Sequence, residues 1–222
     1  ELLDTGEVYR IIITMVTPII LSTFIYNCNS SLNLTIYTRI MEYVKGMSEA
    51  DAYTQYGLFS GKAKQISNIP IALASAMSTA VIPGVSGSFA RMDIRETNRK
   101  IAAAVRTTML LSIPSAVGLA VLAKPVVLLL YPQKESVDMV SQLLAGLSVS
   151  VVFYAISTIS NGVLQGIGKV NLPVINAAAA LVLQTAALVL LLLFTDLGLH
   201  SLVVATVLYS FLMCILNGIS VK

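Results

Sequence analysis

The 222-residue chain is strongly apolar: 56% of its residues are hydrophobic, 11% are charged, and the mean hydropathy is +0.84. Soluble domains carry charges on about 25% of their residues, so this composition excludes an ordinary water-soluble globular domain. The formal net charge is only +3, and we expect membrane lipids rather than nucleic acid as partners.

Six long stretches of the chain contain no charged side chain. Each is long enough, or nearly so, to cross a hydrocarbon core about 30 Å thick as an α-helix that rises about 1.5 Å per residue. The sequence therefore predicts an all-α polytopic membrane protein. Its six predicted transmembrane helices cover residues 11–31, 66–89, 107–123, 140–165, 172–194 and 202–221.

Two of the connections between these spans carry signals for short helices. Ser48 followed by Asp51 is typical of a helix N-cap, and Gly57 is typical of a helix end, so we expect an interfacial helix over residues 49–56. The apolar run within residues 124–132 is bracketed by prolines and too short to cross the membrane. It predicts an interfacial or re-entrant segment.

The connection between the second and third spans holds the densest basic cluster of the chain. Its basic residues are Arg91, Arg95, Arg99, Lys100 and Arg106. The positive-inside rule places this connection in the cytoplasm. Alternation of the spans then places both ends of the chain, and a tight turn predicted at residues 166–171, on the cytoplasmic side.

The chain begins at Glu1, and its first apolar run is too long for a signal peptide. We therefore expect a piece of a longer protein, with residues 1–222 forming a single six-helix domain. Cys28 and Cys214 lie in different spans, so we expect no disulfide and interpret both as small packing residues.

Polar side chains form a line along the fourth span. Its members, at steps of four, three, four and four, are Ser150, Tyr154, Ser157, Asn161 and Gln165. An unpaired amide or hydroxyl is costly in hydrocarbon, so this line faces either a neighbouring helix or a hydrated cavity. Both interpretations stay open.

Similar polar lines run along the first two spans. The first span carries Pro18, Ser22, Tyr26, Asn29 and Asn33. The second carries Asn68, Ser75, Thr79, Pro83 and Ser86. Small residues beside the second line, namely Ala72, Ala76 and Ala80, favour its interpretation as a contact between helices.

Motifs for catalysis are missing from the sequence. There is no His-Glu-x-x-His, Cys-x-x-Cys or Gly-x-x-x-x-Gly-Lys, and no pair of aspartates lies within a span. We predict that the chain is not an enzyme and holds no metal or cofactor. A membrane-embedded glycosyltransferase or polymerase is the alternative, with Glu42, Glu49 and Asp51 as its only candidate acids.

Five strings occur in a recognisable order along the chain. They are Tyr56-Gly57, IPIALASA at 69–76, VIPGVS at 81–86, GLAVLAKP at 118–125 and VLQGIGK at 163–169. Over residues 10–222 the chain resembles the polysaccharide biosynthesis and export proteins of the multidrug/oligosaccharidyl-lipid/polysaccharide flippase superfamily. It looks closest to the stage V sporulation protein B branch, which is related to the lipid II flippases.

This resemblance implies a MATE-like fold in which two six-helix lobes surround a central cavity. The chain would be the C-terminal lobe, and the missing N-terminal lobe would be its partner. The implied activity is alternating-access transfer of a lipid-linked oligosaccharide across the bacterial cytoplasmic membrane, with an undecaprenyl-pyrophosphate-linked cell-wall precursor as substrate. A multidrug exporter of the same fold is the alternative. It would favour an intramembrane carboxylate and a more aromatic cavity than this chain offers.

Charge and position select candidate substrate-facing residues. They are Asn29, Arg39, Tyr154, Asn161 and Gln165 along the cavity, and Arg91 and Arg106 at its inner mouth. Basic side chains there would hold the pyrophosphate. Anchoring at the membrane interface is the competing interpretation for the three arginines, and it is favoured for Arg91 and Arg106.

Overall fold

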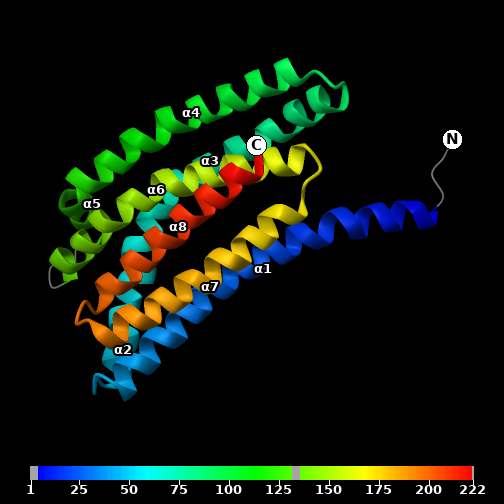
Figure 1. Ribbon diagram of the computed structural model, residues 1–222. Coiled ribbons are helices and arrows are strands. Elements are labelled where there is room, and N and C mark those ends of the chain that lie inside the picture. The colour runs from blue at the N-terminus through cyan, green and yellow to red at the C-terminus, as the bar shows by residue number, and fades with distance from the viewer. Residues whose placement is uncertain (1–4, 132–135, 222) are drawn as a thin grey trace.

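The computed structural model describes residues 5–131 and 136–221, apart from the side chains of several residues in the first helix. Pro18, Ser22 and Tyr26 of the first predicted polar line, and Pro132 of the predicted interfacial segment, lie outside the described part. Every element in this part is helical (Figure 1). The elements are α1 (Thr5–Tyr43), α2 (Glu49–Gly57), η1 (Leu58–Ala63), α3 (Lys64–Ala90), α4 (Ile94–Val121), α5 (Ala123–Leu130), α6 (Val137–Gly166), α7 (Asn171–Phe194) and α8 (Leu199–Val221).

Five helices in the described part are long and apolar enough to cross a membrane, judged by length and composition. They are Glu49–Ala90, Ile94–Val121, Val137–Gly166, Asn171–Phe194 and Leu199–Val221. The predicted span over residues 11–31 lies in α1 and is not among the five, so the predicted count of six is not reached. The all-α polytopic class is confirmed. The six-helix lobe and the orientation of its ends stay predictions.

The helix predicted over residues 49–56 begins as expected, and α2 ends at Gly57, but the helical path of the chain continues beyond it. Ser48 Oγ accepts a hydrogen bond from the Asp51 N–H at 3.1 Å, which is the predicted N-cap. Gly57 keeps a helical φ of −60°, and the chain continues through the π-helical η1 into α3. Phe59 and Ala63 of η1 are buried in the main core, and this packing carries the helix past the glycine.

The basic cluster lies mostly on a helix rather than in a separate connection. Met92 turns the chain with a φ of 59°, and Asp93 Oδ1 caps α4 by accepting a hydrogen bond from the Glu96 N–H at 2.9 Å. Because of this cap, α4 begins at Ile94, well before the predicted start at residue 107.

Of the other two predicted connections, the tight turn is confirmed, and the interfacial or re-entrant segment stays a prediction. Residues 124–130 lie in the short helix α5, although its depth in the membrane stays a prediction. At the predicted tight turn, Gly168 adopts a φ of 80° and the Lys169 N–H donates to the Leu164 carbonyl at 2.8 Å. A positive φ of this kind is readily accessible to glycine.

The helices pack around α6. It contacts α3, α4, α5 and α8, while α7 lies against α8 and α1 (Figure 1). As a result, α4 lies on one side of the molecule, and α1 and α7 lie on the other. The α3–α6 contact depends on Gly162, because a Cβ there would overlap Ser78 Oγ. Small residues of this kind let the backbones of transmembrane helices approach closely.

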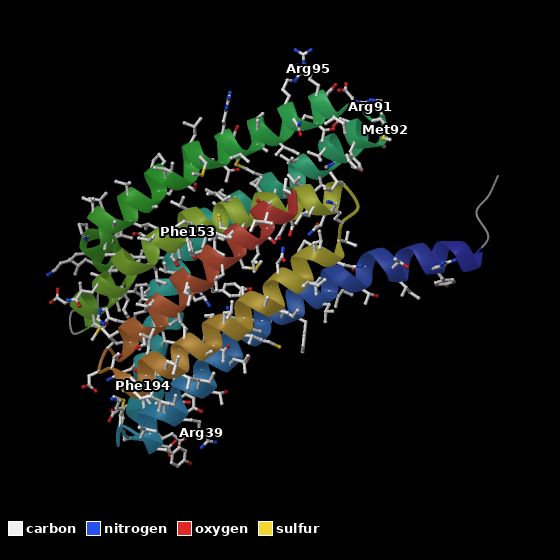
Figure 2. All side chains as sticks on the ribbon, in the orientation of Figure 1. Arg39, Arg91, Met92, Arg95, Phe153 and Phe194 are labelled. Carbon is white, nitrogen blue, oxygen red and sulfur yellow. The ribbon has the colours of Figure 1, made fainter. Side chains whose placement is uncertain are left out.

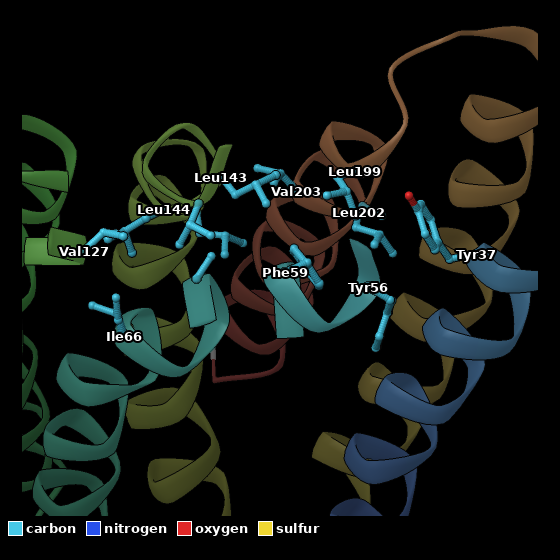
Figure 3. Close-up of a cluster of buried hydrophobic side chains, with 14 of the residues drawn as sticks. Tyr37, Tyr56, Phe59, Ile66, Val127, Leu143, Leu144, Leu199, Leu202 and Val203 are labelled. Atoms are coloured by element: carbon cyan, nitrogen blue, oxygen red, sulfur yellow. The ribbon is translucent and has the colours of Figure 1, made fainter. Parts of the chain in front are cut away.

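The main hydrophobic core lies near the α2 end of the molecule (Figure 3). Tyr37, Tyr56 and Phe59 form a row of tilted rings with centroids about 6 Å apart. The Tyr37 hydroxyl donates to Gln55 Oε1 at 2.8 Å, and the Tyr56 hydroxyl donates to the Ser30 carbonyl at 3.0 Å. This core joins one end of α1 to α2, η1, α6 and α8. Both cysteines are free, as predicted.

Candidate functional site

Amide side chains tie α1 to α7 inside the protein. Asn33 Nδ2 donates to Asn29 Oδ1 at 2.9 Å, and Gln184 Nε2 donates to Asn33 Oδ1 at 2.8 Å. All three side chains are buried. Buried amides need such partners because desolvation of an unpaired polar group is costly. Asn29 therefore holds, from within α1, the Asn33 amide that reaches α7, and its predicted role towards a substrate stays a prediction.

The predicted polar line of α6 is largely used for packing against α8. Asn217 Nδ2 donates to Ser157 Oγ at 3.0 Å and to Asn161 Oδ1 at 2.8 Å. Asn217 Oδ1 accepts from Asn176 Nδ2 of α7 at 2.8 Å. Three helices are thus joined through one central amide. Of the two open interpretations of this line, the contacts support helix packing at Ser157 and Asn161.

The remaining members of the α6 line lie further along the helix in each direction. Tyr154 is buried, and its ring centroid lies 6.1 Å from that of Tyr209 on α8. Gln165 is half-buried in the last turn of α6, where its carbonyl accepts a bond from the Gly168 N–H at 3.1 Å. Neither placement tests a role in binding.

The candidate arginines are exposed and lie on different elements. Arg39 Nη1 donates to the Tyr43 hydroxyl at 2.9 Å, and its side chain is 63% exposed. Arg91 lies at the α3–α4 turn and Arg106 on α4, both exposed. Figure 2 shows Arg39 and Arg91 near opposite ends of the molecule. The structure therefore does not gather the predicted residues into one site.

The predicted polar line of the second span lies on an exposed face of α3. Ser75, Thr79, Pro83 and Ser86 are all exposed, and the neighbouring alanines are exposed too. The buried face of α3 is a different one, with Pro70, Ala74, Ser78 and Val85. The expected contact of the polar line with another helix is therefore not seen in the described part of the chain.

Lys64 begins the same face of α3, four residues before Asn68. Its Nζ donates to Ser30 Oγ of α1 at 3.3 Å, so the cation lies where α1 and α3 meet. Lys64 was not predicted as a site residue, because in the sequence it is simply the charged residue that precedes a charge-free stretch. Its spacing of four residues from Asn68 places both side chains on one face of a helix, and this spacing could have identified Lys64 from the sequence. Lys62 points elsewhere: its Nζ donates to Ser136 Oγ at 2.9 Å.

This face of α3 runs from the half-buried Lys64 and Asn68 to the exposed Ser86, and it offers a cation and hydroxyl groups to a ligand. A lysine ammonium binds phosphate as a point charge. Ser75 and Thr79 donate their hydroxyl hydrogens to the carbonyls four residues earlier, each at 3.1 Å. Their oxygens therefore keep lone pairs that accept hydrogen bonds from the hydroxyls of a sugar.

Comparison with known proteins identifies the family. The model of the family described as "Lipid II flippase MurJ" matches residues 7–220. Lipid II flippase MurJ of Bacillus subtilis (strain 168) is 26% identical over 117 residues, which are 52% of this chain and 22% of that protein. No solved structure matches. The expected flippase superfamily is confirmed, whereas the sporulation branch stays a prediction. Because the family model covers nearly all of it, the chain belongs to the lipid II flippase MurJ family.

Proposed function

We propose that the chain is one lobe of a flippase that carries a lipid-linked cell-wall precursor across the bacterial cytoplasmic membrane. Membership of a family of flippases, which are transporters rather than enzymes, supports this class of activity. The matched part of the chain corresponds to 22% of the length of the Bacillus subtilis relative. We therefore assign the remaining wall of the cavity to an N-terminal lobe.

The observation that carries the proposal is the exposed face of α3. A charged or polar surface on a spanning helix is expensive against lipid and typical of a hydrated pathway. In this proposal Lys64 holds the pyrophosphate of an undecaprenyl-linked precursor, and Ser75 and Thr79 accept hydrogen bonds from its sugar. The small side chains of Ala72 and Ala76 leave room for the headgroup.

The buried amides give this lobe its rigidity in the proposed transport cycle. The hydrogen bonds of Asn217 join α6, α7 and α8, and those of Gln184 join α7 to α1. A lobe joined in this way moves as one body, as alternating access between two lobes requires. Asn29 and Asn161 would then act by positioning helices. The same holds for Tyr154.

Complementation tests the proposed substrate class. The full-length protein is expressed in a bacterium depleted of its own lipid II flippase, and survival is scored. We expect rescue. Failure to rescue, with membrane expression confirmed, would contradict the assignment to a peptidoglycan precursor and favour another lipid-linked polysaccharide or drug export.

The same assay tests two further candidates, which lie outside the buried amide networks. Arg39→Ala and Gln165→Ala are expected to reduce rescue while membrane expression stays at the parental level, if these side chains contact the precursor. Rescue at the parental level by both variants would remove both residues from the site.

A further inference from the structure

One face of α4 carries an unbroken line that changes from basic to apolar. Its members, at steps of four, seven, four, three and four, are Arg95, Arg99, Arg106, Leu110, Ile113 and Val117. These steps keep all six side chains on one side of an α-helix. All six are exposed, and Leu110 is 75% exposed. The line is named here the α4 stripe.

The surface along the stripe is hollowed in two places. Asp93, Arg95, Glu96 and Arg99 line an open depression of about 570 Å³. Arg106 lies at the rim of a second depression, of about 460 Å³, whose other lining residues are Met109, Leu110, Ile113 and Pro114. A basic hollow and an apolar hollow therefore follow each other along α4.

The two carboxylates at this end of α4 have partners other than the arginines. Glu96 is paired with Lys100 at 3.0 Å, and Asp93 caps the helix. Among the described residues, Arg95, Arg99 and Arg106 form no ion pair. A guanidinium without a partner is well suited to a phosphate group, which it can bind through two parallel hydrogen bonds.

We propose that the α4 stripe binds an anionic phospholipid of the surrounding membrane. Its phosphate lies between Arg99 and Arg106, which are separated by about 10 Å along the helix axis and both have long side chains. Its acyl chains lie along Leu110, Ile113 and Val117. From Arg106 to Val117 the helix rises about 16 Å, close to half of a hydrocarbon core about 30 Å thick.

The change from basic to apolar selects a lipid over an acidic protein. A water-soluble acidic protein would leave the apolar half of the stripe unused, whereas a phospholipid matches both halves. The α4 stripe lies on a different helix from the proposed transport face on α3, and the two helices pack against each other. The inference rests on the membrane location of α4 and not on the identity of the transported substrate.

Site-directed photo-crosslinking tests the proposal. The full-length protein is reconstituted in equal amounts of phosphatidylglycerol and phosphatidylcholine, with a diazirine amino acid replacing Leu110. The matched control carries it in place of Leu190, an exposed apolar residue of α7. Mass spectrometry gives the ratio of the two captured lipids. Since each basic side chain contributes about a factor of five at a membrane surface, we expect the ratio at Leu110 to exceed that at Leu190 by about fivefold or more.

A charge-removal variant completes the test. The double variant Arg99→Gln/Arg106→Gln is expected to lower the Leu110 ratio to that of Leu190, and Lys169→Gln, on the α6–α7 turn, is expected to leave it unchanged. Equal ratios at the two positions in the parent would show contact with bulk lipid only and overturn the proposal. A ratio that the double variant leaves unchanged would do the same, as would capture of a protein at Leu110 in native membranes.

Discussion

Gln184 of α7 donates a hydrogen bond from Nε2 to Asn33 Oδ1 of α1, and the two atoms lie 2.8 Å apart. Gln184 is completely buried, and Asn33 is 2% exposed. Asn33 also donates to Asn29, so it is the middle member of a chain of three amides. The middle member serves two partners, and this makes the three positions unequal in their effect on stability.

We expect Asn33→Leu to destabilise the protein more than Gln184→Leu. Loss of Asn33 leaves groups on both Asn29 and Gln184 unpaired, and each unpaired buried group costs about 1–3 kcal/mol. Loss of Gln184 leaves only Asn33 Oδ1 unpaired and also removes Gln184 Oε1, which has no partner among the described residues. Thermal unfolding in detergent measures the order. A larger loss for Gln184→Leu would contradict this bonding scheme.

Asn217 should be the most sensitive polar position of the second network. Asn217→Leu removes the bonds to Ser157, Asn161 and Asn176 at once, and we expect it to lower the free energy of unfolding by about 2–3 kcal/mol. Ser220→Ala, at the edge of the same network, is the control and should cost less than about 1 kcal/mol. Equal losses in thermal unfolding would show that Asn217 is not the centre of the network.

Two glycine-to-alanine changes should act in opposite directions. Gly162→Ala would place a methyl group against Ser78 Oγ and 3.1 Å from the Ser78 carbonyl, so it should separate α3 from α6 and destabilise the protein. A Cβ at Gly118 meets no atom within 4 Å, and Gly118→Ala should stabilise α4 by about 0.5–1 kcal/mol. The melting temperatures of the two variants should lie on either side of the parental value.

The ion pair between Lys45 and Asp196 joins the segment after α1 to the α7–α8 loop, with Nζ and Oδ1 2.6 Å apart. The hydrogen bond and charge of Lys45 hold the pKa of Asp196 below its ordinary value. A lowered folded-state pKa adds stability above the unfolded-state pKa, and this is lost as the pH falls through the folded-state value. Asp196→Asn should therefore lower the melting temperature slightly at neutral pH and not in strong acid. A difference that persists in acid would point to packing instead.

Local signals in the sequence predicted local structure well. The Ser48 cap and the turn at Gly168 depend on neighbours a few residues away, and both are confirmed. The α-helix α2 ends at Gly57 as predicted, but the helical path continues through η1, and this depends on the packing of Phe59 in the core. The start of α4 was also not predicted. Asp93 caps the helix, so α4 begins at Ile94, whereas the charge-free stretch placed the start of the span at residue 107.

The direction in which a polar line faces could not be predicted from spacing. The lines of α3 and α6 have the same helical periodicity, yet Asn161 pairs with Asn217 across a helix contact while Ser75 is exposed. The partner of Asn161 lies 56 residues away in the sequence, and no local pattern identifies it. The contact of Lys64 with Ser30 is also between helices, so no local pattern around Lys64 identifies it.

We propose that the exposed face of α3, with the half-buried Lys64 at its end, binds the pyrophosphate of a transported lipid. The most direct measurement is the rate at which the full-length protein in proteoliposomes flips a lipid-linked precursor. Lys64→Gln is expected to lower this rate by roughly tenfold or more, since a lost charge-assisted bond is worth about 1.5–3 kcal/mol. Lys64→Arg should retain most of it, and Lys124→Gln, which removes only an exposed ion pair with Asp138, should flip at the parental rate. A parental rate in folded Lys64→Gln protein would contradict the claim.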